Sequence, residues 1–444
     1  MTPSQTPGRP WILPDFAAEE GGDWRAYPRE PSARIAARLL GLLFAPAARL
    51  LHPGRDGAWI AEPVHAPWPS DLGPPPDRAV LPWLDPSPEA FAWLNTRTLA
   101  DAVARGLPGQ PVGRLAGAEP ACIEAIADKR FALDCARSLG LHSPALDPLI
   151  EVIEPAECLR VDETIARLEA ALAAWPDWTG RRYTLKPRLG SSGRGRTGGA
   201  GSVDAPAVRG ALVHLARRGG AIFEPWLERT RDLSVSLRQG RGAAHPEILA
   251  SFELLTSRSG LFRGHCGVIE ANGQIVSGDP EDARLRAGAV AVARRAADRG
   301  FFGLCGIDAF RHREGEREAW RGAVELNPRP TMGFVTFGLV LRALASGRAA
   351  TRSGAGQPSA FLFTLLGAAG RTTDGSVASS AASTPGDAAD PAASRAEAIL
   401  ARAGAGVQML ELTPDRAADE PRAVLYLGPD RAALREACRS VTGC

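Results

Sequence analysis

Two neighbouring apolar runs in the last third of this chain carry a small set of polar side chains. Asp308 lies within the first run, and Glu325 and Asn327 lie at the end of the second. A carboxylate inside an apolar run is costly to bury unless it is paired or bound to a metal. Two carboxylates and an amide oxygen are ligands of the kind that Mg²⁺ prefers. The pattern therefore predicts a metal site on two strands, with a salt-bridged strand pair as the alternative, and Arg329 adds a cation for a phosphate.

A lysine followed by a loop rich in glycine and serine forms a second pattern. Residues 182–186 predict a strand that ends at Lys186, and Ser191, Ser192 and Gly193 lie in the loop behind it. Glycines let backbone N–H groups turn toward an anion, serines add hydroxyl donors, and the lysine supplies charge. Because the lysine precedes the glycines, this is not a Walker-type P-loop. The pattern predicts a phosphate site, and a loop that is simply mobile is the alternative.

A third pattern begins where the apolar run 221–224 ends. Glu224 is followed by Trp226 and Leu227, and Asp232 comes eight positions after Glu224. A short linker after a strand can offer backbone groups to the edge of an adenine, and a nearby acid can accept ribose hydroxyls. A surface turn with solvated charges explains the same residues without a ligand.

Bulk composition narrows the class of protein. The length of 444 residues predicts two or three domains, and a net charge of +2 gives no reason to expect a nucleic-acid partner. The seven cysteines are scattered and include no C-x-x-C, which argues against a disulfide framework and a zinc site and indicates free thiols in a reducing cytoplasm. No signal peptide and no apolar run of 18 residues occur, so we expect a cytoplasmic protein without a membrane span.

The first 115 residues differ in amino-acid composition from the rest of the chain. They hold 19 of the 37 prolines and six of the ten tryptophans, so short strands and much coil are expected. We predict strands near 11–13 and 58–60, and helices from 33 towards 51 and near 88–105. The region has no obvious strand–glycine loop–helix start of a mononucleotide-binding unit. It is expected to be a domain of its own, with its tryptophans as core anchors.

The remaining chain divides into three segments. Residues 116–350 mix antiparallel-looking strands with segregated helices, which favours an α+β domain. Residues 372–395 are mostly Ala, Ser, Thr, Gly, Pro and Asp and predict a linker. Residues 396–444 predict a small C-terminal α/β element made of a helix, two strands and a second helix.

Taken in chain order, these patterns resemble the ATP-grasp superfamily of carboxylate–amine and carboxylate–thiol ligases. The order is Lys129, Lys186 with its glycine loop, the segment 224–232, then Asp308, then Glu325-x-Asn327-x-Arg329, and the resemblance covers about residues 116–345. It implies an ATP-grasp fold, in which two α+β subdomains clasp ATP, with residues 1–115 as a pre-grasp domain.

The resemblance also implies roles for individual residues. It implies Lys186 and Arg329 as catalytic groups, and Asp308, Glu325 and Asn327 as ligands of two Mg²⁺ ions, for which Mn²⁺ is an alternative. The contacts to ATP that it implies come from Lys129, Lys186, Ser191, Ser192, Gly193, Glu224, Trp226, Leu227, Asp232 and Leu326.

The activity implied is ligation driven by ATP. A small-molecule or peptide carboxylate would become an acyl-phosphate that an amine attacks, with ADP released, and neither nucleic acid nor membrane would take part. The resemblance leaves room for a homodimer. A carboxylase or formyl-transfer enzyme of the same superfamily is the first alternative, because the segment 327–330 resembles purine-biosynthetic members. The second alternative is a nucleotide-binding regulator without activity.

The sequence departs from the superfamily pattern at two positions. Gly306 stands where some of these ligases carry an arginine that steadies a tetrahedral intermediate, and Thr331 stands where the purine-biosynthetic members usually show a histidine. Arg263 or His265, on a strand-like stretch, is a candidate for the missing substrate contact. A solvated turn is the alternative interpretation of both.

Overall fold

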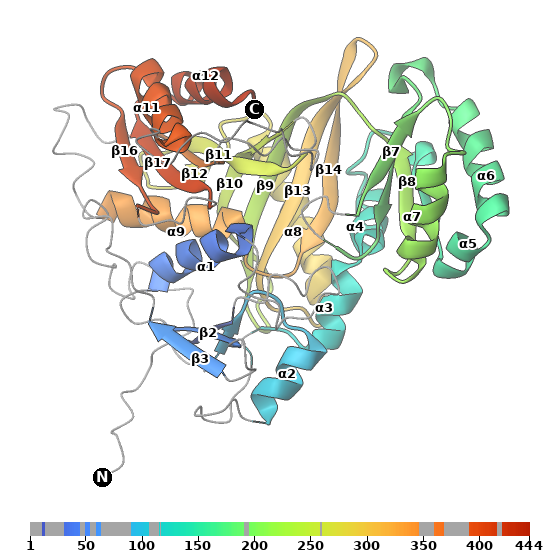
Figure 1. The fold of residues 1–444 in the computed structure, drawn as a ribbon, viewed down its shortest axis with the longest axis horizontal. Helices are drawn as coiled ribbons and strands as arrows, with labels where there is room; N and C mark the ends of the chain where they lie inside the picture. Colours follow the sequence, from blue (N-terminus) through green and yellow to red (C-terminus); the bar gives the residue numbers. More distant parts are fainter. Residues whose placement is uncertain are drawn as a thin grey trace, which may run out of the picture.

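The structure is a computed structural model. It describes residues 11–13, 31–44, 49–53, 59–63, 90–105, 115, 117–190, 195–257, 260–345, 359–367, 390–414 and 420–444. Over these residues the chain forms a four-stranded N-terminal sheet, a second four-stranded sheet and a nine-stranded sheet (Figure 1). The second sheet and the large sheet stand side by side, and the N-terminal sheet lies below the large one (Figure 1).

The N-terminal sheet has the strand order β3-β2-β1-β4. Its central strand β1 runs parallel to both β2 and β4, so β1, α1 and β2 form a parallel strand–helix–strand unit that the sequence did not reveal. The helix predicted towards residue 51 ends at Phe44, and the helix predicted near 88–105 is a strand followed by a shorter helix. The elements are β1 (Trp11–Leu13), α1 (Pro31–Phe44), β2 (Arg49–Pro53), β3 (Trp59–Pro63), β4 (Ala90–Ala92) and α2 (Arg97–Ala104).

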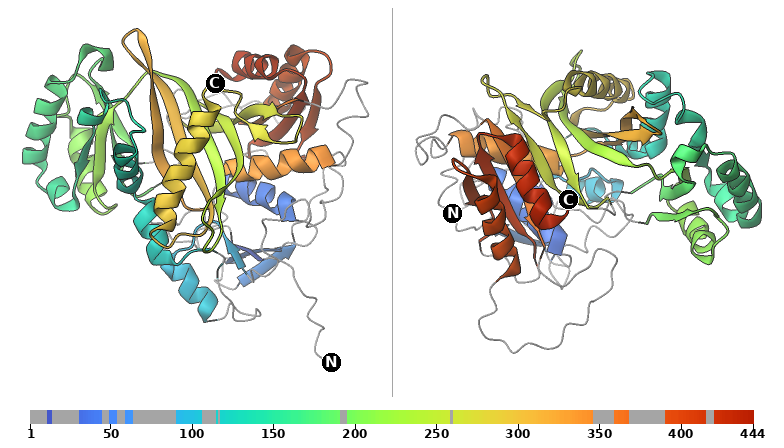
Figure 2. Two further views of the ribbon diagram at one scale, coloured as in Figure 1. Left: turned by 180° about the vertical axis from the view of Figure 1, so that it is seen from behind. Right: turned by 90° about the horizontal axis from the view of Figure 1, so that it is seen from above.

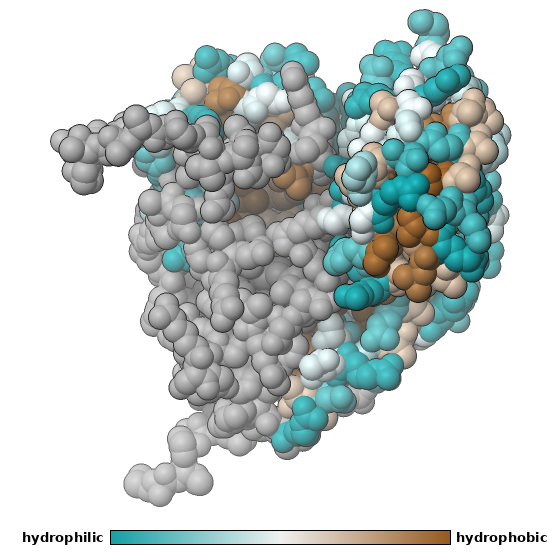
Figure 3. Space-filling model, turned by 45° about the vertical axis from the view of Figure 1, so that its right-hand side comes forward, coloured by the Kyte–Doolittle hydropathy of each residue, from teal (hydrophilic) through white to brown (hydrophobic). Residues whose placement is uncertain are grey.

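The second sheet is antiparallel and has the order β5-β8-β6-β7. Alternation along β6 and β8 sends Leu185 and Phe223 into a core formed with α6 and α7, and turns Lys186 and Glu224 to the other face. Among the described residues, the large apolar side chains that are exposed to solvent belong to this unit. Figure 3 shows an apolar patch on its surface. Its elements are β5 (Glu151–Ile153), α5 (Pro155–Leu159), α6 (Val161–Ala173), β6 (Arg182–Pro187), β7 (Thr197–Ala200), α7 (Pro206–Ala216) and β8 (Ala221–Pro225).

The large sheet has the order β14-β13-β9-β10-β12-β11-β15-β17-β16. Helices α3, α4 and α8 cover one face, and α9 together with α1 covers the other (Figure 2). The elements of its first part are α3 (Pro120–Ala127), α4 (Lys129–Ser138), β9 (Arg229–Gln239), β10 (Glu247–Thr256), β11 (Phe262–Ile269), β12 (Ile275–Val276), α8 (Asp282–Ala297), β13 (Gly303–Glu314), β14 (Arg317–Asn327) and α9 (Met332–Ala345).

The C-terminal residues extend the large sheet instead of forming a separate unit. Strand β15, which the sequence analysis did not predict, pairs with β11 on one side and with β17 on the other. Helix α11 begins at Pro391, so the last residues of the predicted linker are helical, while 372–389 lie outside the described residues. The elements are β15 (Ala360–Leu366), α11 (Pro391–Ala403), β16 (Gln408–Glu411), β17 (Arg422–Gly428) and α12 (Arg431–Thr442).

Period-two alternation divides the core of the large sheet into two layers. Leu233, Val235 and Leu237 of β9 face α8, whereas Phe252 of β10 and Phe361 of β15 face α1 and α9. All seven cysteines are free. No helix within the described part of the chain is both long enough and apolar enough to cross a membrane.

Candidate functional site

The two predicted metal carboxylates lie opposite each other on adjacent strands. Asp308 of β13 pairs with Glu325 of β14 in antiparallel register, and Asn327 Nδ2 donates a hydrogen bond to Asp308 Oδ2 at 3.2 Å. Between Glu325 and Asn327, the side chain of Leu326 points to the opposite face and packs with Ile307 in the core beneath the sheet. The structure therefore brings Asp308, Glu325 and Asn327 together, and places Leu326, an expected ATP contact, in the core instead.

Lys129 supplies the counter-charge of this carboxylate pair. Its Nζ lies 3.1 Å from Glu325 Oε2 and also donates to the carbonyl oxygen of Gly190. Lys129 is the first residue of α4, and its backbone N–H donates to the oxygen of Arg188 at 3.1 Å, just beyond the end of β6. Arg188 in turn binds the Asp128 carboxylate that caps α4. These bonds dock the start of α4 against the second sheet and carry Lys129 into the space between the two sheets.

Burial and the nearby charges shift the pKa values of the two carboxyl groups in opposite directions. Burial and then the Glu325 carboxylate raise the pKa of Asp308 above its ordinary value. Burial alone would raise the pKa of Glu325, but Lys129 and Lys186 outweigh it and hold that pKa below its ordinary value. Two like charges in one buried site cannot both ionise freely without further positive charge.

The donor set fits a hard divalent cation. Two carboxylates and one amide oxygen on a single sheet face leave the remaining ligand positions to phosphate oxygens and water, as Mg²⁺ requires. Within the described residues no group of three or more His, Cys, Asp or Glu side chains is arranged to hold a metal. Two carboxylates and an amide oxygen fit an ion shared with a phosphate ligand better than the four-ligand site of a structural zinc ion.

Lys186 belongs to a buried ion network at the facing edge of the second sheet. Its Nζ lies 2.8 Å from Glu224 Oε1, and Arg321 of β14 lies 2.7 Å from Glu224 Oε2. Burial lowers the pKa of Lys186 to about 8 although Glu224 opposes the shift. Burial would raise the pKa of Glu224, but Arg321 and then Lys186 hold it well below its usual range. The Glu224 carboxylate thus binds two cations of the protein.

The predicted linker is built around Trp226. Its backbone N–H donates to the oxygen of Arg182 at 2.8 Å, and the guanidinium carbons of Arg196 and Arg229 lie 4.3 and 5.1 Å from its ring centroid. Leu227, the next residue, is buried. The linker is therefore held against the start of β6, with a cation on the tryptophan ring.

The predicted ribose acid, Asp232, has both carboxylate oxygens engaged within the protein. Oδ1 accepts from Arg229 at 2.9 Å, and Oδ2 accepts from the Thr256 hydroxyl at 2.9 Å. Asp232 lies two positions from Ser234, which pairs with Asp308, so it shares the sheet face of the carboxylate pair. Each oxygen accepts one bond in these contacts, so a ribose hydroxyl could donate to a remaining lone pair beside Arg229 or Thr256.

Arg329 lies beside the carboxylate pair. Its Nη2 donates to Asn327 Oδ1 at 3.1 Å and its Nη1 to the oxygen of Pro330 at 3.0 Å. Its guanidinium carbon lies 5.2 Å from the ring centroid of Trp93, which comes from the N-terminal region. The sequence analysis identified Arg329, and it expected Trp93 to be a core anchor only.

The two candidate substrate residues differ in their surroundings. His265 is 1% exposed and packs between Phe252 and Phe262, with both ring centroids 4.8 Å away. Its Nδ1 faces the Thr336 hydroxyl at 2.8 Å, and burial lowers its pKa to about 3. The structure thus places His265 in the core as a neutral side chain, and its contact with a substrate stays a prediction. Arg263 is half-buried and forms no ion pair with any described residue.

The two departures from the superfamily pattern form one steric arrangement. A Cβ added at Gly306 would lie 2.6 Å from the Thr331 side-chain methyl carbon, so Thr331 fills the space that a side chain at 306 would need. An arginine at position 306 and a threonine at position 331 exclude each other here. The predicted loop residues Ser191, Ser192 and Gly193 lie outside the described residues.

The composition of the basic residues also points to this site. The 52 basic residues comprise 50 arginines and two lysines, and these two are Lys129 and Lys186. In a chain that uses arginine at almost every cationic position, lysine stands at the two positions where a compact, single-point charge faces the carboxylate cluster. Arg321 carried no such signal, because nothing local sets it apart from the other arginines.

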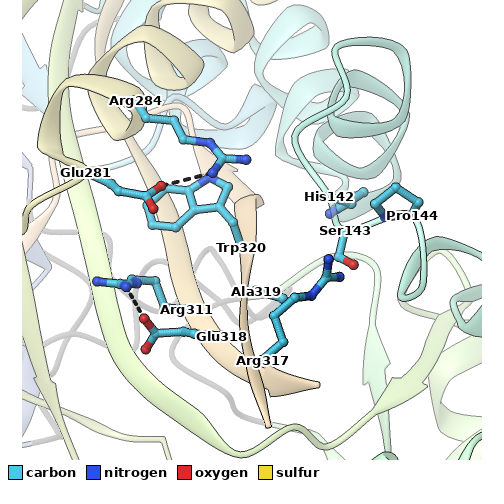
Figure 4. Close-up of a pocket in the computed structure, with 10 residues that line it drawn as sticks. All are labelled: His142, Ser143, Pro144, Glu281, Arg284, Arg311, Arg317, Glu318, Ala319 and Trp320. Carbon is cyan, nitrogen blue, oxygen red and sulfur yellow. Dashed lines mark hydrogen bonds and ion pairs between the residues drawn. The ribbon is translucent and has the colours of Figure 1, made fainter. Parts of the chain in front are cut away.

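A separate cavity of about 200 Å³ lies near the tip of the β13–β14 hairpin (Figure 4). Residues 142–144, the start of α8 and Trp320 line it, and the Arg284–Glu281 ion pair at 2.9 Å forms part of its wall. Trp320 belongs to the core on the sheet face opposite to Asp308. The cavity is therefore distinct from the carboxylate cluster.

Comparisons with known proteins bear on the fold. No family model matches the chain, and a search of curated proteins finds no match. An N5-carboxyaminoimidazole ribonucleotide synthetase in complex with ADP has a TM-score of 0.51 at 14% identity, over 99% of this chain and 98% of that one. The carboxyaminoimidazole ribonucleotide synthase of Aspergillus clavatus complexed with ATP has the same TM-score and identity over 98% of each chain. At this identity the likeness speaks for architecture alone, and it shows that this chain has the ATP-grasp fold.

Proposed function

We propose that this chain is an ATP- and Mg²⁺-dependent ligase that converts a carboxylate into an acyl-phosphate for attack by an amine, with release of ADP and phosphate. The observation that carries the proposal is the Asp308–Glu325 pair with Lys129 at 3.1 Å, facing a second sheet that presents Lys186. Two carboxylates, an amide and two lysines between two sheets match what a triphosphate with its metal ions requires.

The chemistry of each side chain suggests its role in binding the metal ion or the phosphates. Asp308, Glu325 and Asn327 would hold Mg²⁺, and the ion would supply positive charge against the phosphates. Lys129 and Lys186 approach from the second sheet and its junction with α4, and each offers a point charge to the phosphates. Because both lysines are already paired with carboxylates, the bound nucleotide would exchange with, or share, these partners.

Arg329 is the proposed group for the reacting phosphoryl. Its guanidinium is held beside Asn327, and a fixed planar cation can stabilise three phosphoryl oxygens or an acyl-phosphate without rearranging. An acyl-phosphate hydrolyses when water reaches it, so the site must close during the reaction. We assign this closure to the glycine- and serine-rich loop after Lys186, on its sequence alone.

Arg263 is the proposed contact for the substrate carboxylate. It lies on β11 where the pairing with β10 shifts by one residue, between Phe262 and Gly264, so strand alternation does not fix the face of its side chain. Its neighbour His265 packs on the face that carries Phe252 and α9. Register across β10 and β9 links this face to that of Asp308. A half-buried arginine without an ion-pair partner among the described residues is suited to a carboxylate, which it can bind through two parallel hydrogen bonds.

Carboxylation is the second candidate function. It is supported by near-complete alignment, over 98% or more of both chains, with carboxyaminoimidazole synthases, one of them in complex with ADP and 5-aminoimidazole ribonucleotide. In that case bicarbonate is the acid and the activated species is carboxyphosphate. The same residues would hold the nucleotide, and only the acid and the amine differ.

A screen for ADP release tests the proposal and separates the candidates. Wild-type protein is incubated with MgATP and a matrix of carboxylic acids and amines that includes bicarbonate with 5-aminoimidazole ribonucleotide, and products are identified by mass spectrometry. Release of ADP that depends on both an acid and an amine supports ligation. Binding of ATP without ADP release under any condition would instead support a nucleotide-binding regulator.

A further inference from the structure

A segment of the N-terminal region, residues 93–95, lies beside the carboxylate cluster. Trp93 follows β4, is 4% exposed, and packs in the core layer that contains α1 and α9. Two residues later the side chain of Asn95, also buried, donates to the oxygen of Ala118 at 3.1 Å, just before α3. The segment is thus anchored through Trp93 to the core layer of α1 and α9, and through Asn95 to the residues just before α3.

Trp93 presents its ring to the guanidinium of Arg329. The 5.2 Å distance between the guanidinium carbon and the ring centroid lies within the range of a cation–π contact, which extends to about 6 Å. Such a contact holds the cation near the ring face without using any of its N–H donors. The same guanidinium also donates to Asn327 and to Pro330.

Arg329 in turn fixes the orientation of the Asn327 amide. An arginine only donates, so the atom of Asn327 that faces it must be the oxygen, and this turns the amide nitrogen toward Asp308. A chain of contacts therefore runs from the ring of Trp93 through Arg329 and Asn327 to the carboxylate of Asp308.

We infer that Trp93 is a positioning residue through which the N-terminal domain aligns Arg329 with the reacting phosphoryl group. The inference rests on the proposed function of the site. Asn327 Oδ1 is both the acceptor of Arg329 and the proposed ligand of Mg²⁺, so Arg329 would share this oxygen with the ion or exchange its bond when the nucleotide binds. A stacking contact has no single donor–acceptor direction, so the ring can retain the guanidinium while its hydrogen bonds are exchanged.

Substitutions at Trp93 separate positioning from packing. Trp93→Leu removes the π face and keeps an apolar side chain, whereas Trp93→Phe keeps a ring. For Trp93→Leu we expect kcat for ADP formation to fall roughly 10- to 100-fold, as for a small misplacement of a reacting group, with the Kd for MgATP within about twofold of wild type. Trp93→Phe should recover most of the loss. Phe361→Leu, which removes a buried ring of the same core layer, is the matched control and should leave kcat within about threefold.

A spectroscopic measurement tests the contact without turnover. In arginine-labelled protein, the Nε–H resonance of Arg329, assigned by its loss in Arg329→Lys, should be shifted upfield by the Trp93 ring and should return toward the random-coil position in Trp93→Leu. The inference is overturned if this resonance is unshifted in the wild type, or if Trp93→Leu and Phe361→Leu lower kcat equally. If no acid and amine produce ADP, the proposed function fails while the resonance still decides whether the contact exists.

Discussion

Asp308 and Glu325 face each other in register across β13 and β14, and the Lys129 ammonium lies 3.1 Å from the second of them. Two buried carboxylates this close are unfavourable unless positive charge is brought to them. The protein supplies one such charge from α4 and leaves the pKa of Asp308 raised. We therefore expect a further cation to bind favourably beside the pair.

Loss of the Lys129 ammonium should weaken nucleotide binding. In Lys129→Met the carboxylate pair loses its counter-charge and a triphosphate loses a charge-assisted hydrogen bond, so we expect MgATP to bind about 10- to 100-fold more weakly, equivalent to about 1.5–3 kcal/mol. Isothermal titration measures the effect. Arg130→Met, at the neighbouring exposed position, is the control and should bind MgATP normally. Equal affinity in Lys129→Met and wild type would remove Lys129 from the site.

Nucleotide affinity should fall as the pH rises through about 8. Burial lowers the pKa of Lys186 to about 8, so the free protein loses this ammonium in the alkaline range and with it one attraction for the phosphates. We expect the Kd for MgATP to rise between pH 7 and 9, and Lys186→Arg, which stays charged, to lose this dependence. A pH-independent Kd in the wild type would contradict the assignment.

The same shift has a definite sign for stability. Between pH 8 and the ordinary lysine pKa, the unfolded chain binds a proton at Lys186 that the folded protein has released, so this residue makes the free energy of unfolding increase with pH in that window. Lysine labelled with ¹⁵N at the side chain gives a direct measurement, because the chain contains only two lysines and hence two side-chain resonances. One of them should titrate near pH 8.

The buried network around Glu224 should be sensitive to loss of its carboxylate charge. Glu224→Gln leaves Lys186 and Arg321 buried without their common counter-ion, so we expect a loss of about 3–5 kcal/mol in the free energy of unfolding. Urea denaturation measures this loss. Glu163→Gln, whose carboxylate pairs with Arg160 on the surface, is the control and should change stability by less than about 0.5 kcal/mol. A loss as small as that of the control would show that the network is not strongly coupled.

The packing of Gly306 against Thr331 predicts a compensating pair of substitutions. Gly306→Ala places a methyl group 2.6 Å from the Thr331 methyl carbon and should cost about 1–3 kcal/mol of stability. Thr331→Ser removes that methyl and should recover most of the loss in the double variant. Thermal unfolding of the four proteins of this cycle gives the coupling energy. Additive effects of the two substitutions would argue against the contact.

Much of the fold could be predicted from local signals. Pro120 at the first position of α3 and the Asp128 side chain that caps α4 are local signals of the kind that mark where helices begin. The runs that became β6, β8, β13 and β14 were also identified, and their order along the chain indicated the architecture. Local propensity sufficed here because helix caps and apolar runs act over a few residues.

The surroundings of other residues could not be predicted, because tertiary contacts decide them. Leu326 and Glu325 are adjacent, but strand alternation sends them to opposite faces, and only the register shows which face is the core. His265 lies beside the half-buried Arg263, yet the rings of Phe252 and Phe262 enclose it. Strand β15 follows a stretch without apolar anchors, and its partners lie on β11 and β17, far away in the sequence.

The central claim is that the Asp308–Glu325 pair holds Mg²⁺ with ATP. The most direct test measures ADP formation as a function of Mg²⁺ concentration in wild type and in Glu325→Gln, with Glu318→Gln, on the β13–β14 hairpin beside the separate cavity, as the control. We predict that Glu325→Gln lowers Mg²⁺-dependent turnover about 10²- to 10³-fold, as for loss of one electrostatic stabiliser, while Glu318→Gln retains it. Unchanged Mg²⁺-dependent ADP formation in Glu325→Gln would contradict this account of the site.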